Sequence, residues 1–139
     1  IRLSLVGSEM CIETALARTS DLAILGIGST RPDYCSLLQG GHISRKDLNT
    51  IIGQGAVGDV NGHYFDLQGQ SSNVDFHRRL IGLPREDLQR IPVRFGTAGS
   101  TQKAEAILGA LRGGFINYLT TDSAAAVRVL DLAKSGQGS

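Results

Sequence analysis

The chain has 139 residues, of which 41% are hydrophobic and 19% charged, a composition that excludes a disordered chain and indicates one globular domain or part of one. Its 14 basic and 13 acidic residues leave a net charge of +1 and form no basic stripe, so we do not expect these residues to contact nucleic acid directly. No apolar run approaches the roughly 18 residues of a membrane span and no signal peptide is present, and we expect a cytoplasmic protein. The chain begins with Ile1 rather than Met, so we expect a fragment of a longer protein.

The first part of the sequence predicts a helix followed by a strand. Residues 9–19, EMCIETALART, place apolar side chains at helical spacing, and Ser8 is the expected N-cap. Residues 21–29, DLAILGIGS, form a continuous apolar run that predicts a parallel strand buried on both faces. GIGSTR contains only the first half of a dinucleotide-binding fingerprint, because Arg31 replaces the third glycine and Pro32 follows. A nicotinamide site is therefore disfavoured.

The middle of the chain predicts an irregular, partly antiparallel insertion. Residues 44–54 begin with Ser44 and Asp47 in the spacing of a capping box and predict a short surface helix. Residues 55–83 contain strand fragments such as HYFDL between glycine turns. The segment HRRLIGLPREDLQR is typical of an exposed loop that leads into a short helix beginning at Pro84.

The last third alternates strand and helix. IPVRFGTAG predicts a strand, STQKAEAILGALRGG a helix that ends at Gly113 and Gly114, and FINYLTTD the next strand. Asp122 is the expected N-cap of a final helix, and we divide the chain into a single domain of residues 1–134 and a flexible tail of residues 135–139. This alternation predicts an α/β fold with an open, right-handed parallel sheet of Rossmann-like type.

Ligands of such sheets bind beyond the carboxyl ends of the strands, which here are the loops GIGST, GTAGST and LTTD. The first two loops combine glycines with hydroxyl side chains, so we place Gly28, Ala98 and Gly99 at the site. GTAGSTQK is expected to present free backbone N–H groups at a helix N-terminus with Lys103 in the first turn, as a phosphate site requires. A solvated helix lysine is an equally good interpretation of Lys103.

The cysteines and histidines do not form the pattern of a metal site. Cys11 and Cys35 lack CxxC spacing, and we expect two reduced, structural thiols. His42, His63 and His77 do not stand at i, i+4 from one another, and we expect loop or surface histidines. We therefore predict no metal, no cofactor and no catalytic residue.

Four motifs occur in the order and near the spacing found in the SorC family of bacterial transcriptional regulators, the sorbitol-operon regulators: DLAILGIGS, GAVGDVNGHYFD, RLIGLPREDLQRIPVRFGTAG and KAEAILGALRGGFINYLTTD. From about Glu9 to Leu130 the chain resembles the C-terminal part of that family's effector-binding domain. The resemblance implies a fold similar to glucosamine-6-phosphate deaminase and ribose-5-phosphate isomerase, a sugar or sugar phosphate as effector, and a homo-oligomer, either dimer or tetramer. It also implies that DNA is bound only through an N-terminal helix-turn-helix domain outside this sequence.

The resemblance assigns roles to three residues. Asp59 of the GAVGD loop matches an acidic residue that binds the effector's hydroxyls, and Asn61 is expected to face the same ligand. Lys103 matches a lysine that contacts the effector's phosphate. Many relatives carry paired glycines before this lysine, whereas Ser100 takes the second position here and either adds a hydrogen bond or narrows the pocket.

Three functions stay open on the sequence. An effector-sensing domain of a transcriptional regulator, which binds a sugar or sugar phosphate without turnover, is favoured by the order of the motifs. A sugar-phosphate isomerase or deaminase of the same fold is the alternative, and it requires a base near the sugar C2, for which Asp59 is the only candidate in these loops. A nicotinamide-dependent enzyme is disfavoured by the incomplete fingerprint.

Overall fold

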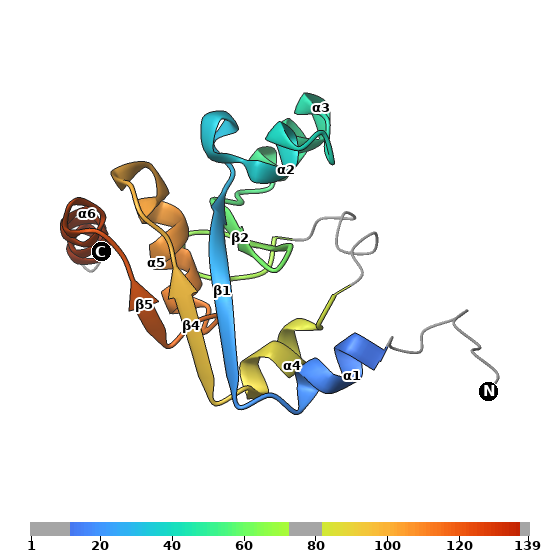
Figure 1. Ribbon diagram of the computed structural model, residues 1–139. Coiled ribbons are helices and arrows are strands. Elements are labelled where there is room, and N and C mark those ends of the chain that lie inside the picture. Colours follow the sequence, from blue (N-terminus) through green and yellow to red (C-terminus); the bar gives the residue numbers. More distant parts are fainter. Residues whose placement is uncertain (1–11, 73–81, 137–139) are drawn as a thin grey trace.

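The computed structural model describes residues 12–72 and 82–136, in which five strands form one sheet in the order β3-β2-β1-β4-β5 (Figure 1). The strands are β1 (Leu22–Ser29), β2 (Gly58–Val60), β3 (His63–Phe65), β4 (Val93–Thr97) and β5 (Tyr118–Thr120). β1, β4 and β5 are parallel, whereas β2 and β3 pair in antiparallel fashion at one side. The expected α/β fold, a Rossmann-like parallel sheet with a partly antiparallel insertion, is confirmed.

Helices surround this sheet at both ends and on one face. They are α1 (Ile12–Arg18), α2 (Ser36–Gln39), α3 (Arg45–Gly53), α4 (Arg85–Arg90), α5 (Ala104–Arg112) and α6 (Ser123–Ser135), with 3-10 turns η1 (Pro32–Tyr34) and η3 (Thr101–Lys103). Figure 1 shows α2 and α3 beyond the carboxyl end of β1, and α1 and α4 at its amino end. α5 packs on the sheet and α6 packs on α5. No helix of the described residues is long and apolar enough to cross a membrane.

Helix ends follow the capping residues that the sequence predicts. Ser44 Oγ accepts a hydrogen bond from Asp47 N at 3.1 Å, and Asp47 Oδ2 accepts one from Ser44 N at 2.8 Å, which forms the expected capping box of α3. Asp122 is the N-cap of α6, as expected. α5 ends at Gly113, and Gly114 follows at a φ of 66°, a conformation that favours glycine.

The main core lies between the sheet and α5. Phe65 and Phe115 are both fully buried there, with ring centroids 4.8 Å apart. A smaller core lies under α2 and α3 and includes Leu48, Tyr64 and Cys35. Cys35 is a buried, free thiol as expected, whereas Cys11 lies outside the described residues.

Close packing against α5 determines which way the residues of β2 face. A Cβ atom on Gly58 would lie 2.4 Å from Ala106 Cβ of α5, so only glycine allows this approach. Because side chains alternate along a strand, Asp59 points to the opposite face of the sheet. Its cross-strand partner Tyr64 is buried in the smaller core on that face.

β1 is not buried on both faces, and this prediction is wrong. Leu22 and Ile24 are 50% and 73% exposed, whereas Ile27 is buried in the main core. α5 covers only one face of the strand, and on the other face Leu22 and Ile24 stay largely exposed among residues 12–72 and 82–136. One face of the parallel sheet is therefore bare near its amino ends.

Most of the exposed loop predicted before α4, residues 77–81, lies outside the described residues. Of its described end, Gly82 is exposed, whereas Leu83 is buried in the main core and its carbonyl oxygen lies 2.8 Å from His63 Nε2. His63 is thus a half-buried strand residue rather than a surface histidine. α4 begins directly after Pro84, as expected. His77 lies outside the described residues, as does Ser8.

The last helix has the bounds that the sequence predicts, residues 123–135 after the cap Asp122, and so it extends into the segment assigned to a tail. α6 includes Ser135, and Gly136 is its C-cap, so the first two residues assigned to the tail belong to the helix end. Residues 137–139 lie outside the described part of the chain.

Candidate functional site

The carboxyl ends of the parallel strands meet at one edge of the sheet. Gly26 of β1 pairs with Thr97 of β4, and Thr97 pairs with Thr120 of β5. The loops GIGST, GTAGST and LTTD therefore lie side by side, as the sequence predicts. β2 joins the same edge because its Gly58–Val60 segment pairs with the last residues of β1.

Asp59 lies directly over Gly28. The two residues are cross-strand partners, and a Cβ atom on Gly28 would lie 2.0 Å from Asp59 Oδ1. Glycine is required here so that the carboxylate, rather than a ligand, can approach the backbone of β1. Asp59 Oδ2 also accepts a hydrogen bond from Gly62 N at 3.2 Å.

The surroundings of Asp59 disfavour its charged form. Burial raises the pKa of Asp59, and this effect outweighs the hydrogen bond from Gly62 and the nearby charges of Lys103 and His63, which lower it. A carboxylate held in this way gains more from a hydrogen-bonding ligand than a carboxylate in water does.

Lys103 reaches back to the sheet. Its Nζ donates to the Ile27 carbonyl oxygen at 2.9 Å, and the residue is half-buried, so its interpretation as a solvated helix lysine is wrong. Its charge acts on Asp59 through space, but no carboxylate of the described residues lies within ion-pair distance of its ammonium group. An ammonium group has three N–H donors, so two remain for a ligand.

Most backbone amides of the loop after β4 already have acceptors, contrary to the prediction of free N–H groups. Ser100 N donates to Asp122 Oδ2 at 2.6 Å. Ser100 Oγ accepts from Gln102 N at 3.3 Å, and Ser100 O accepts from Lys103 N at 3.0 Å. Ser100 thus accepts from the Gln102 and Lys103 amides, and Asp122, 22 positions further along the sequence, accepts from the amide of Ser100 itself.

The two other predicted residues of this loop differ from each other. Ala98 is buried and its N–H donates to Thr120 O at 3.2 Å, so it supports the sheet and does not face a ligand. Gly99 is exposed, and no described residue accepts from its N–H. A Cβ atom on Gly99 would lie 2.8 Å from Asp122 Oδ2. Gly99 under Asp122 thus repeats the arrangement of Gly28 under Asp59.

Asp122 is held in its charged form. Hydrogen bonds from the Ala125 and Ser100 amides lower the pKa of this exposed carboxyl group. Sequence reasoning identified Asp122 only as a helix cap and missed its bond to Ser100. The capping signal is local, whereas the second bond depends on the two loops being neighbours in the sheet.

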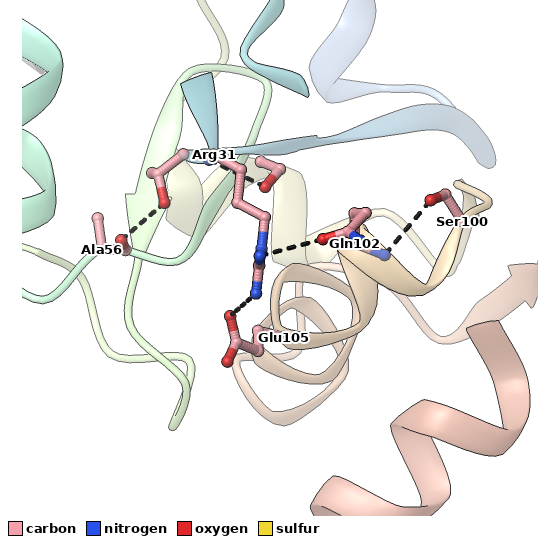
Figure 2. A network of polar contacts seen from close by, with 7 residues as sticks. Arg31, Ala56, Ser100, Gln102 and Glu105 are labelled. Carbon is pink, nitrogen blue, oxygen red and sulfur yellow. Dashed lines mark hydrogen bonds and ion pairs between the residues drawn. The ribbon is translucent and has the colours of Figure 1, made fainter. Parts of the chain in front are cut away.

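Arg31 ties the loop after β1 to the start of α5 (Figure 2). Its guanidinium group donates to Gln102 Oε1 at 3.0 Å and lies 3.4 Å from Glu105 Oε2, and Figure 2 shows its side chain extended toward both. Thr30 Oγ1 donates to Ala56 O at 3.0 Å and fixes the same loop to the insertion. The sequence singled out Arg31 only as the residue that breaks the dinucleotide fingerprint.

Asn61 follows the end of the strand that carries Asp59. It occupies the turn between β2 and β3 at a φ of 51°, a conformation that asparagine tolerates better than most residues. It lines a cavity of about 440 Å³ beside residues 22–25 of β1, and neither Asp59 nor Lys103 lines that cavity. The structure brings Gly28, Asp59 and Lys103 together, and Asn61, two positions beyond Asp59, lines this neighbouring cavity.

The site has groups that can bind a polar ligand. In the part of the chain that the structure describes, no three His, Cys, Asp or Glu side chains are placed to hold a metal ion. A carboxylate can accept two hydroxyl hydrogen bonds, and an ammonium group with free donors can bind an anion. Asp59 and Lys103 together suit a ligand with hydroxyl groups and an anionic end.

Residues 5–131 match a family model described as "Putative sugar-binding domain". The chain belongs to this sugar-binding domain family. It is 42% identical over 127 residues to the transcriptional regulator LsrR of Escherichia coli K12, in an alignment that covers 88% of this chain and 40% of LsrR.

Solved structures of the sugar-binding domain family have the same fold. A sugar-binding domain of a transcriptional repressor from Vibrio fischeri is 34% identical, with a TM-score of 0.76 over 87% of this chain and 48% of that one. A sor operon regulator from Shigella flexneri is 26% identical, with a TM-score of 0.75 over 84% of this chain and 44% of that one. The expected relation to the SorC family is confirmed. The chain spans less than half the length of these relatives.

Proposed function

We propose that this chain is the effector-sensing part of a bacterial transcriptional regulator and that it binds a sugar or a sugar phosphate. The observation that carries the proposal is the pair formed by Asp59 over Gly28 and Lys103 anchored on Ile27 O, at the edge of the sheet where such folds bind ligands. Membership of the sugar-binding domain family and the similarity to LsrR support it.

Each residue has a distinct role in this proposal. Asp59 accepts hydrogen bonds from neighbouring sugar hydroxyls, which replace the water lost on burial of its carboxylate. Lys103 donates to a phosphate or another anionic group at the end of the sugar. The exposed N–H of Gly99 lies in the same loop and adds a neutral donor.

The proposed site binds its ligand without turnover. An isomerase or deaminase of this fold needs a base at the reacting carbon, whereas Asp59 is proposed to hold the sugar hydroxyls and Asp122 accepts from the Ser100 and Ala125 amides. The relatives reported above are transcriptional regulators, which supports binding without turnover over the enzyme alternative.

The chain is proposed to form the C-terminal part of one effector-binding domain. Ile24, Phe95 and Tyr118 form a row across the bare face of the sheet, and the rings of Phe95 and Tyr118 stack with centroids 6.3 Å apart. Parallel sheets are covered on both faces in folded proteins. The Vibrio fischeri domain contains about as much chain again beyond the matched half, and the equivalent segment is proposed to pack on this row.

The partners follow from the same proposal. DNA is contacted by a helix-turn-helix domain outside these residues, and the regulator acts in the cytoplasm as a homo-oligomer, either a dimer or a tetramer. The sugar changes DNA binding by stabilising one arrangement of the effector domain over another.

Isothermal titration of the intact protein with sugars and their phosphates, ribose 5-phosphate and fructose 6-phosphate among them, tests this function. We expect saturable binding of at least one phosphorylated sugar, and NMR spectra after hours of incubation that show the sugar unchanged. An isomerised or deaminated product would favour the enzyme alternative, and no binding to any member of the panel would contradict the proposal.

A further inference from the structure

Asp122 joins two loops at the carboxyl edge of the sheet. Its Oδ1 accepts from Ala125 N of α6 at 2.8 Å, and its Oδ2 accepts from Ser100 N at 2.6 Å. An N-cap requires only the first of these bonds. The second bond reaches the loop that leads to Lys103, and capping alone does not explain it.

Ser100 has a backbone conformation that residues with a side chain rarely adopt, with φ 81° and ψ 136°. Such a conformation persists only where the surrounding contacts hold it. The contacts are the bond from Ser100 N to Asp122, the bond from Lys103 N to Ser100 O and the bond from Gln102 N to Ser100 Oγ. Of these, only the bond to Asp122 comes from another loop.

The turn at Ser100 leads directly into η3, whose last residue is Lys103. Two anchors fix this lysine: Ser100 O accepts from its backbone N–H, and Ile27 O accepts from its Nζ. The bond from Lys103 N to Ser100 O depends on the conformation of the Ser100 turn, which the bond from Ser100 N to Asp122 stabilises.

We propose that Asp122 is a positioning residue of the effector site, which acts through Ser100 to fix the loop that presents Lys103 to the anionic group of the effector. This inference rests on the proposed function, in which Lys103 binds that group. In this role Asp122 acts through Ser100 rather than by contact with the effector, since one of its oxygens accepts from the Ser100 amide and the other from the Ala125 amide.

The charge of Asp122 distinguishes a positioning role from a purely electrostatic one. A carboxylate beside the loop repels an anion through space, so a purely electrostatic role predicts that removing its charge strengthens phosphate binding. A positioning role predicts the opposite. Asp122→Asn keeps one acceptor oxygen for the cap, but its amide group cannot accept from Ser100 N while its oxygen caps α6.

Matched variants separate the bridge from the cap. Asp122→Ser keeps a capping hydroxyl at the start of α6. Its shorter side chain has a single oxygen, which cannot also reach Ser100 N to accept a second hydrogen bond. Ser44→Ala removes the capping box of α3, which contributes none of the three strand-end loops. It measures what the loss of a cap alone does to binding.

The experiment is isothermal titration of the intact protein with ribose, ribose 5-phosphate, fructose, fructose 6-phosphate and inorganic phosphate. We expect Asp122→Ser and Asp122→Asn to reduce the preference for the phosphorylated sugar about tenfold, at the lower end of the effect of losing a charged hydrogen bond. Affinity for the unphosphorylated sugar is unchanged in both. In Lys103→Ala, adding Asp122→Ser causes no further loss, because both substitutions remove the same contact. Ser44→Ala lowers the melting temperature and leaves both affinities unchanged.

The outcomes distinguish this inference from the proposed function. If wild type prefers the phosphate and Lys103→Ala loses that preference, an unchanged or increased preference in the Asp122 variants overturns the positioning role alone. An equal loss for both sugar forms also overturns it, since that result indicates general loosening of the site. If wild type binds none of these ligands, the proposed function fails and the positioning role fails with it.

Discussion

Two carboxylates lie over two glycines at the same edge of the sheet, yet their surroundings have opposite effects. Burial raises the pKa of Asp59 over Gly28, whereas hydrogen bonds from two amides lower the pKa of Asp122 over Gly99. Asp122 therefore stabilises the fold in its charged form, and Asp59 destabilises it. A carboxylate that lowers the stability of the fold at the ligand-binding edge is typical of a group kept for binding. A carboxylate whose hydrogen bonds stabilise the fold is typical of a structural group.

Gly28→Ala is expected to have the largest effect. The new Cβ atom would lie 2.0 Å from Asp59 Oδ1, so the carboxylate must leave its position, and overpacking of this kind costs about 1–3 kcal/mol of stability. Affinity for both sugar forms falls as well, because Asp59 is displaced. Gly26→Ala is the matched control, since nothing lies within 4 Å of a Cβ atom there. Thermal unfolding that is equal for the two variants would contradict the close contact.

Asp59→Asn is expected to weaken the phosphorylated and the unphosphorylated sugar alike. The amide keeps the shape of the side chain but replaces a charged acceptor, which costs about 1–2 kcal/mol of binding. Calorimetric titration with each sugar and its phosphate measures this effect. A loss confined to the phosphorylated sugar would place the hydroxyl groups elsewhere.

The two carboxylates are expected to give opposite dependence of stability on pH. For Asp59 the folded pKa is raised, so its cost is present at neutral pH and disappears as pH falls through that pKa. For Asp122 the folded pKa is lowered, so its contribution is present above the ordinary value and is lost in more acidic solution. Asp59→Asn should therefore raise the free energy of unfolding at pH 7, whereas Asp122→Asn should lower it.

Denaturant unfolding of both variants and wild type between pH 3 and pH 7 measures these differences. Each difference from wild type should shrink as the solution becomes more acidic, Asp59→Asn first. Two differences of the same sign at pH 7 would show that the carboxylates do not have opposite roles.

Much of the fold was predictable because its signals are local. The capping residues Ser44 and Asp122 and the stop at Gly113 act on backbone within a few positions, and the structure confirms each of them. The alternation of strand and helix likewise indicated the parallel sheet and its carboxyl edge.

What the sequence did not predict depends on residues distant along the chain. The amide of Ser100 is occupied by Asp122, 22 positions later, and this bond interrupts the row of free N–H groups that the sequence predicts. Gly28 makes room for Asp59 of the neighbouring strand rather than for a ligand. The exposure of Ile24 depends on which elements pack on each face of the sheet, and an apolar run in the sequence does not predict whether both faces are covered.

Ser100→Gly is expected to have the smallest effect. Glycine relieves the strained backbone at a φ of 81°, but it removes the hydroxyl that accepts from Gln102 N, so the two changes offset each other to within about 1 kcal/mol. Ser100→Ala keeps the strain and removes the hydroxyl, and it should be the less stable of the two in thermal unfolding. The reverse order would show that the backbone is not strained.

The most direct test of the account is the effect of Lys103→Ala on phosphate preference. Calorimetric titration of wild type and Lys103→Ala in the intact protein with fructose and fructose 6-phosphate compares the two sugar forms. We predict that Lys103→Ala loses about 1.5–3 kcal/mol of binding to the phosphorylated sugar, roughly tenfold to a hundredfold in affinity, and almost none to the unphosphorylated one. An equal preference for the phosphate in both proteins would contradict the assignment of Lys103 to the anionic end of the effector.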